Sequence, residues 1–173
     1  MEIQLSVISN SDQERFFNLF NLYLYELSQF TGEDVREDGS FDQGNNHLYL
    51  EKQALHPYLI RADDRIAGFV LVCSPPYTPE GAEFSIQELF LLKKFRGLNL
   101  AAEAVNEVFK MHPGIYHVEQ LANNQPAVRF WKKLYADLNI QFTEERDLIE
   151  IDGLPGEHEI LSQTFSVAGV RVQ

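Results

Sequence analysis

One stretch of this chain, residues 88–101, constrains the fold more than any other. An apolar run from Phe84 to Leu92 ends abruptly, a short basic turn follows over residues 93–97, and a helical pattern begins at Leu98. This order predicts a buried strand, a tight turn and the first turn of a helix. Free backbone N–H groups and the positive end of the helix dipole would then point at one place, so the sequence predicts an anion site there.

The charge of the chain makes this turn stand out. The 173 residues include 26 Asp and Glu against 14 Lys and Arg, which gives a net charge of −12. Such a balance argues against nucleic acid and anionic membranes as partners. Three of the cations, Lys93, Lys94 and Arg96, nevertheless fall within four residues. Their clustering beside Gly97 favours phosphate contacts, although solvated loop charges remain the alternative.

Cysteine usage and the N-terminal sequence predict the compartment. Cys73 is the one cysteine and sits in an apolar run, where a buried and inert thiol is expected. The chain cannot form an internal disulfide framework, which suits a reducing compartment. Its first residues match neither a signal peptide nor a transit peptide, and it has no apolar run of about 20 residues that could span a membrane. We therefore expect a cytoplasmic protein.

Hydrophobic periodicity predicts one α/β domain over residues 1–173, with a mixed sheet flanked by helices. Strands are expected near residues 2–8, 58–62, 66–72, 83–92, 115–119, 139–151 and 157–166. Helices are expected from a capping box at 11–14 to about residue 30, over 98–111, and from Asn124 to about residue 138. The polar segment 31–46 should form a loop, and residues 166–173 a short C-terminal extension.

Two motifs, in this order of elements, carry a resemblance to a known enzyme family. Residues 94–101, Lys-Phe-Arg-Gly-Leu-Asn-Leu-Ala, resemble a Gln/Arg-x-x-Gly-x-Gly/Ala turn. Residues 124–134, Asn-Gln-Pro-Ala-Val-Arg-Phe-Trp-Lys-Lys-Leu, resemble an Asn-x-x-Ala-x-x-Phe-Tyr-x-x-Leu helix. Both are features of GNAT-family N-acetyltransferases. The resemblance covers nearly the whole chain and implies the GNAT-like acyl-CoA N-acyltransferase fold, with a central sheet of about seven strands. It also implies acetyl transfer from acetyl-CoA to a primary amine by direct attack.

The resemblance implies that the turn holds the pyrophosphate of acetyl-CoA and that the neighbouring strand orients the pantetheine. The implied contacts come from Phe90, Leu91, Leu92, Lys93, Lys94, Arg96, Gly97, Leu98, Asn99, Leu100, Ala101 and Asn124. Asn99 replaces the second glycine of the family's turn. A positive φ is expected there, and Asn is the non-glycine residue that best tolerates it. Asn124 either caps its helix only, or also contacts the pantetheine.

Glu88 is the candidate general base. Simple alternation places Glu88 on the same strand face as Ile86 and Phe90, and a carboxylate on an apolar face has a raised pKa. The resemblance implies the same role, usually through a water molecule. The alternatives are a solvated glutamate, a glutamate paired with an arginine, or a β-bulge that reverses its face.

The general acid is harder to assign. Trp131 stands where the family has the tyrosine that protonates the departing CoA thiolate, and tryptophan has no acidic group suited to this. Tyr135 lies one helical turn later on the same face and is the candidate substitute. The alternative is that Tyr135 is a core aromatic. If neither residue serves, the proton comes from the amine or from water.

The acceptor and the assembly stay open. The acceptor is expected to be a small-molecule or peptide amine. It would be cationic if the acidic residues Glu33, Asp34, Glu37, Asp38 and Asp42 form a rim of its pocket rather than a solvated face. The five histidines show no metal-ligand spacing, so no metal is expected. Pairing of sheet edges into a homodimer is one assembly to consider.

Two other functions must be weighed. Trp131 and Asn99 also fit a non-catalytic CoA-binding sensor or interaction module of the same fold. A nucleotide-phosphate enzyme that uses the same anion turn is weaker, because the chain has no Gly-Lys-Ser/Thr sequence.

Overall fold

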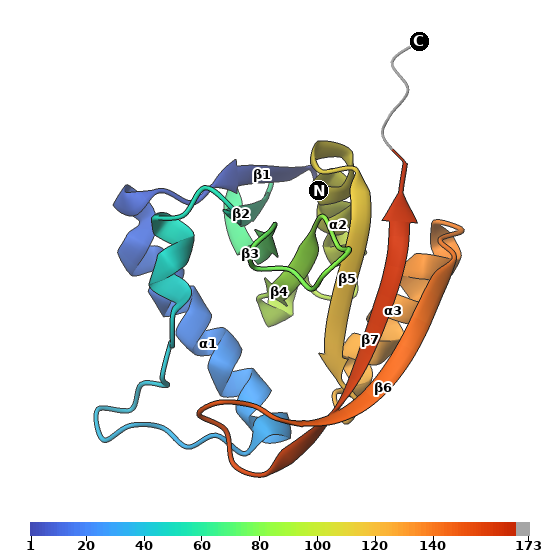
Figure 1. Cartoon of the computed structure of the whole chain (residues 1–173). Coiled ribbons are helices and arrows are strands. Elements are labelled where there is room, and N and C mark those ends of the chain that lie inside the picture. The colour runs from blue at the N-terminus through green and yellow to red at the C-terminus, as the bar shows by residue number, and fades with distance from the viewer. Residues whose placement is uncertain (169–173) are drawn as a thin grey trace.

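The structure, a computed structural model, describes residues 1–168 and confirms the predicted α/β order of elements (Figure 1). Within these residues the elements are β1 (Ile3–Val7), α1 (Gln13–Thr31), β2 (Leu55–Ala62), β3 (Arg65–Cys73), β4 (Ser85–Leu91), α2 (Leu100–Met111), β5 (Gly114–Leu121), α3 (Gln125–Asp137), β6 (Phe142–Glu150) and β7 (Glu157–Val167). Short 3-10 turns cover Asn10–Asp12, Asn46–Leu50 and Lys93–Phe95. No helix in this part of the chain is long and apolar enough to cross a membrane.

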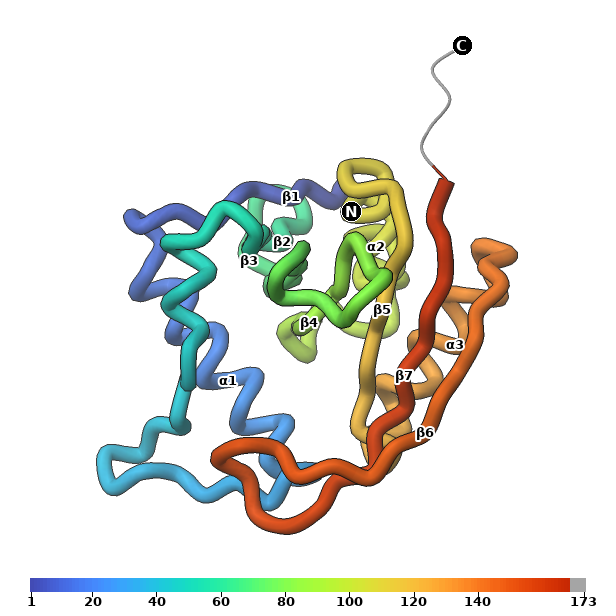
Figure 2. Tube along the Cα trace, viewed as in Figure 1, coloured from blue at the N-terminus to red at the C-terminus, as the bar shows by residue number. Residues whose placement is uncertain are grey.

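The seven strands form a sheet that splits in two. One half has the order β1-β2-β3-β4 and the other the order β5-β7-β6, and all neighbouring pairs are antiparallel. In the described chain the halves join at a parallel bridge between Phe84 and Tyr116. Beside this bridge the His117 N–H donates to the Phe84 carbonyl at 3.0 Å. Past it β4 and β5 have no common ladder, so their facing edges are left open (Figure 2).

Alternation along β3 divides the core between two faces. Val70 and Val72 point to the side that α2 and α3 cover, together with Leu100 and Trp131. Phe69 and Leu71 point to the other side, where α1 packs. The open edges of β4 and β5 therefore lie between α1 on one face and the two later helices on the other.

Two helices begin at different residues from those predicted. The N–H of Ser9 donates to the Asp12 carboxylate at 3.1 Å, so the capping box lies two residues before the predicted one and opens a 3-10 turn ahead of α1. Helix α2 begins at Leu100 instead of Leu98, because Asn99 has a left-handed backbone (φ 63°) that no α-helix can include.

The C-terminal boundary also differs from the prediction. The predicted strand ends at Ser166, where the predicted extension begins, but Val167 also belongs to β7 because it pairs with Gly114. The ladder to β5 continues to Val167 because β5 begins as early as Gly114. Residues 169–173 of the predicted extension lie outside the described residues.

Candidate active site

A cleft of about 1090 Å³ opens between the separated edges of β4 and β5. Its volume lies near the upper end of small-molecule sites, which span about 300–1,000 Å³. Its walls come from α1, β4, the turn after β4, the first turn of α2, the end of β5, α3 and the turn between β6 and β7. The two segments that carried the family resemblance thus meet in one place.

The edge of β4 presents backbone groups to the cleft. Leu92 donates its N–H to the Ala67 carbonyl of β3 at 2.8 Å. Successive residues of a strand direct their backbone N–H and C=O groups to opposite edges. Those of Leu89 and Leu91 therefore point away from β3, toward the cleft. The Leu91 carbonyl accepts from Arg96 Nε at 2.8 Å, which agrees with this direction. Phe90 and Leu91 line the cleft as predicted, whereas Leu92 does not.

The turn after β4 has the backbone conformation of an anion site. Gly97 (φ 74°) and Asn99 (φ 63°) are both left-handed, which confirms the expectation for Asn99. The first bond of α2 runs from the Glu103 N–H to the Asn99 carbonyl at 3.1 Å. The N–H groups of the three residues between them, Leu100–Ala102, therefore have no helical acceptor, and these residues line the cleft.

The basic side chains of the turn behave differently from the prediction. Lys93, Lys94 and Leu98 do not line the cleft. Arg96 does, but its Nη2 lies 2.7 Å from Glu26 Oε2 of α1. The turn therefore lines the cleft with backbone groups rather than with its lysines, and Arg96 ties the turn to α1.

The start of α3 forms the opposite wall. The Asn124 side-chain oxygen accepts from the Ala127 N–H at 3.2 Å, so Asn124 is an N-cap, and it also lines the cleft. Trp131 lines the cleft two turns further along α3 and is 5% exposed. Helix α3 thus places the indole of Trp131 in the cleft at the position where the family motif has a tyrosine.

Glu88 reaches the cleft through a β-bulge. Glu88 pairs with Leu71 and Ile86 pairs with Val72, so Gln87 is an extra residue in β4. Ile86 consequently packs on the α2 and α3 side, while Glu88 and Phe90 face α1. The prediction that all three share one face was wrong for Ile86, because the bulge interrupts the alternation.

The Tyr23 hydroxyl of α1 donates a short hydrogen bond to the Glu88 carboxylate. Burial raises the pKa of Glu88 to about 7, against the opposing effect of this hydrogen bond. Burial and the Glu88 charge raise the pKa of Tyr23 well above its usual value. The phenol therefore keeps its proton, and Glu88 is the group able to exchange one near neutrality. The sequence did not identify Tyr23 as the partner of Glu88, because no local pattern links residues 65 positions apart.

Tyr135 lies away from the cleft. Its side chain is 1% exposed, and its hydroxyl donates to Gln163 Oε1 at 3.3 Å. Its ring centroid lies 4.9 Å from that of Phe165. Burial raises the pKa of its hydroxyl far above the ordinary value. The structure thus places Tyr135 as a core aromatic, the alternative left open by the sequence, and does not bring it to Glu88.

Comparisons with known proteins agree with this geometry. The model of the acetyltransferase (GNAT) family matches residues 15–135, which is more than half of the chain. The chain belongs to the GNAT family. No curated protein sequence matches it.

Several solved structures share the GNAT fold with this chain. NAA60 from Arabidopsis thaliana in complex with acetyl-CoA has a TM-score of 0.62 at 18% identity, over 97% of this chain and 100% of that one. Spermidine N-acetyltransferase from Vibrio cholerae with CoA and spermine has a TM-score of 0.62 at 17% identity, over 94% of each chain. A structure described as histone acetyltransferase HPA2 and related acetyltransferase, from Corynebacterium glutamicum, has a TM-score of 0.64 at 13% identity, over 99% of this chain and 100% of that one. At these identities the likeness establishes the fold alone.

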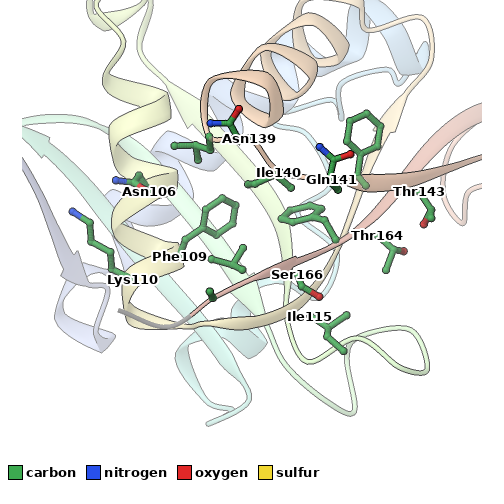
Figure 3. A pocket seen from close by; sticks show the side chains of 15 residues that line it. Asn106, Phe109, Lys110, Ile115, Asn139, Ile140, Gln141, Thr143, Thr164 and Ser166 are labelled. Atoms are coloured by element: carbon green, nitrogen blue, oxygen red, sulfur yellow. The ribbon is translucent and has the colours of Figure 1, made fainter. Parts of the chain in front are cut away.

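Other features of this GNAT protein lie apart from the cleft. A second hollow of about 920 Å³ lies between the end of α2, the α3–β6 connection and the end of β7, with Asn106, Phe109 and Lys110 on the same helix (Figure 3). Among residues 1–168 its lining includes no carboxylate and no histidine. Cys73 is buried, as predicted, and burial raises the pKa of its thiol to about 11. Residues 1–168 contain no cluster of three or more side chains suited to a metal ion.

Proposed function

We propose that this protein is an acetyl-CoA-dependent N-acetyltransferase acting on a primary amine. The observation that carries the proposal is that the N-terminus of α2, with N–H groups that lack helical acceptors, and a carboxylate with a pKa of about 7 line the same cleft. Acetyl-CoA supplies the acetyl group as a thioester. Membership of the GNAT family and the CoA-bound relatives support this choice of donor.

The donor half of the cleft lies on the α2 and α3 side. The N–H groups of Leu100, Ala101 and Ala102, with the dipole of α2, would hold the pyrophosphate charge. The N–H of Leu91 at the open edge of β4 would donate to the acetyl carbonyl and polarise it. Asn124 and Trp131 would line the path of the pantetheine. The residues present fit the donor without any metal.

The acceptor half lies on the α1 side, where Glu88 takes a proton from the incoming ammonium group, directly or through water. The neutral amine then attacks the acetyl carbon, a C–N bond forms and the C–S bond breaks. The departing thiolate takes up the proton that the nitrogen loses on forming the amide. Trp131 has no proton to give, and Tyr135 lies outside the cleft, so neither residue is assigned this step.

Calorimetric titration with acetyl-CoA tests the donor site. We expect saturable binding that Gly97→Val weakens by about tenfold or more, since a β-branched residue strains a left-handed position. Gly39→Val is the matched control: Gly39 is also left-handed (φ 81°) and exposed, and it does not line the cleft. Equal affinity in the two variants would contradict the assignment.

Thiol release in the presence of a panel of primary amines tests the reaction itself. We expect acetyl-CoA and one class of amine to yield free CoA and the N-acetyl product. Glu88→Gln should lower kcat by about 10²–10⁴-fold, the usual contribution of a general base, while acetyl-CoA affinity is kept. Binding of acetyl-CoA without turnover of any amine would favour the non-catalytic sensor instead.

A further inference from the structure

We propose that the acceptor is a monoamine carrying an apolar group, such as an arylalkylamine or a peptide N-terminus with an apolar first side chain, and that polyamines are poor substrates. This inference rests on the proposed acetyl transfer and specifies its acceptor. It follows from how the acceptor half of the cleft distributes its charges and its apolar side chains.

The carboxylates that line the cleft already have partners inside the protein. Among residues 1–168 there are four such pairs: Glu26 with Arg96, Glu88 with Tyr23, Glu119 with His117, and Asp137 with Lys133. Glu88 is needed for the reacting nitrogen, and Glu119 is half exposed at the mouth. A second or third ammonium group, as in a polyamine, would have to compete with an arginine, a histidine or a lysine for its carboxylate.

Apolar side chains make up the wall that faces α1. Leu121 of β5 pairs with Ile160 of β7, so their side chains emerge side by side on one face of the sheet. Ile149 of β6 pairs with His158 and emerges on that same face, since His158 and Ile160 are two residues apart. Each of the three lines the cleft. This face of the second half-sheet is therefore an apolar surface in the same cleft as Glu88.

Two further elements close this surface. Helix α1 contributes Leu27 and Phe30, and the turn between β6 and β7 contributes Ile151 and Leu154. That turn passes beside the C-terminal end of α1 (Figures 1 and 2). Pro155 Cγ lies 3.7 Å from the position that a Cβ on Gly32 would occupy. Apolar side chains of the second half-sheet, of α1 and of the β6–β7 turn thus line this part of the cleft together, as a binding site for a hydrophobic substituent requires.

The acidic loop does not supply the missing negative charge. In the described chain none of residues 33–42 lines the cleft. Asp42 lies 3.0 Å from Arg36 and accepts from the Gly44 N–H, and Asp38 accepts from Ser40. Asp42 is therefore paired within its own loop, and none of the five acidic residues of the predicted rim reaches the cleft.

The test compares 2-phenylethylamine, a short peptide amide with an N-terminal Phe, and spermidine, each in the presence of CoA for binding and of acetyl-CoA for turnover. We expect the two apolar amines to bind, and to be acetylated with kcat/KM, at least about tenfold better than spermidine. Comparing the two apolar probes with each other distinguishes a small arylalkylamine from a peptide. Leu154→Asp should reduce this preference about tenfold or more, because it places a charge on the apolar wall.

Leu148→Asp is the matched control: Leu148 is 61% exposed in β6 and does not line the cleft, so the preference should be unchanged. Tighter binding of spermidine, or a preference that Leu154→Asp leaves intact, would overturn the inference even if acetyl transfer is observed. Apolar binding that Leu154→Asp abolishes would support the inference even if no amine is acetylated, and the lack of turnover would then count against the proposed function alone.

Discussion

At the scale of single residues, the chemistry depends on one inserted residue. Gln87 is the extra residue of the β4 bulge, and it turns Glu88 toward α1 where Tyr23 meets it. Without the bulge, alternation would place the carboxylate on the face of Ile86, against α2 and α3. Bulges commonly re-aim a side chain in this way next to active sites. The direction of the Glu88 side chain and its contact with Tyr23 are thus consequences of backbone geometry.

The pH dependence of turnover should report Glu88. The base must be deprotonated to act, and its pKa is raised to about 7, so kcat/KM should rise with pH to a plateau above that value. The Tyr23 hydrogen bond lowers this pKa, so Tyr23→Phe should move the rising limb to higher pH. A pH–rate profile of both proteins measures this. An unmoved limb in Tyr23→Phe would mean that another group controls the reaction.

Asn99 should tolerate glycine but not valine. Its left-handed backbone costs an ordinary residue roughly 1–2 kcal/mol, and a β-branched residue suffers most. Asn99→Gly should keep acetyl-CoA affinity within a few fold, whereas Asn99→Val should weaken it by about tenfold. Calorimetric titration gives both values. Equal loss in both variants would show that the asparagine side chain, and not the backbone, makes the contact.

At the scale of elements, the sequence predicted those features that depend on residues close together in the chain. The strand, turn and helix over residues 84–111 depend on neighbouring residues, so their order and the left-handed Asn99 could be predicted. The bulge at Gln87 could not, because it arises from register with β3. The Tyr23–Glu88 contact joins residues 65 positions apart, and no periodicity encodes such a distance. Tyr135 failed as a site residue because a helix face does not reveal which neighbour it meets.

Strand β3 must approach β4 closely at Gly68. A Cβ built on Gly68 would lie 1.8 Å from the Phe90 carbonyl oxygen, which is backbone and cannot rotate away. Gly68→Ala should therefore destabilise the fold by about 1–3 kcal/mol and displace the edge that carries Glu88. Urea denaturation and thiol release measure the two effects. Thr143→Ala, on the exposed strand β6, is the control and should change neither.

At the scale of the whole molecule, a histidine cluster reinforces the junction of the two half-sheets. His112, between α2 and β5, lies 2.7 Å from the Tyr58 hydroxyl of β2 through its Nε2. Its ring centroid lies 4.9 Å from that of His56 and 5.1 Å from that of Phe84. The Tyr116 hydroxyl donates to its carbonyl at 2.7 Å. The junction of the two half-sheets thus contains two histidines, whose charge changes with pH.

Protonation of this cluster should weaken the fold in mild acid. Burial lowers the pKa of His56 below its ordinary 6.5, and burial and the neighbouring His56 lower that of His112. Below pH 6.5 these two histidines therefore bind more protons in the unfolded chain than in the folded one, and their contribution to stability is lost as the pH falls toward the folded values. Glu88 acts in the opposite direction, because its raised pKa lets the folded protein take up a proton as the pH falls through about 7.

The two contributions can be separated by comparing unfolding free energies above and below pH 6.5 in three proteins. His112→Gln keeps an acceptor for the Tyr58 hydroxyl but cannot titrate, so it should lose less stability on acidification than the wild type. Glu88→Gln should lose more, because it lacks the compensating proton uptake. If His112→Gln follows the wild-type curve, the junction of the half-sheets does not depend on neutral histidines, and acid sensitivity must come from the carboxylates of this strongly acidic chain.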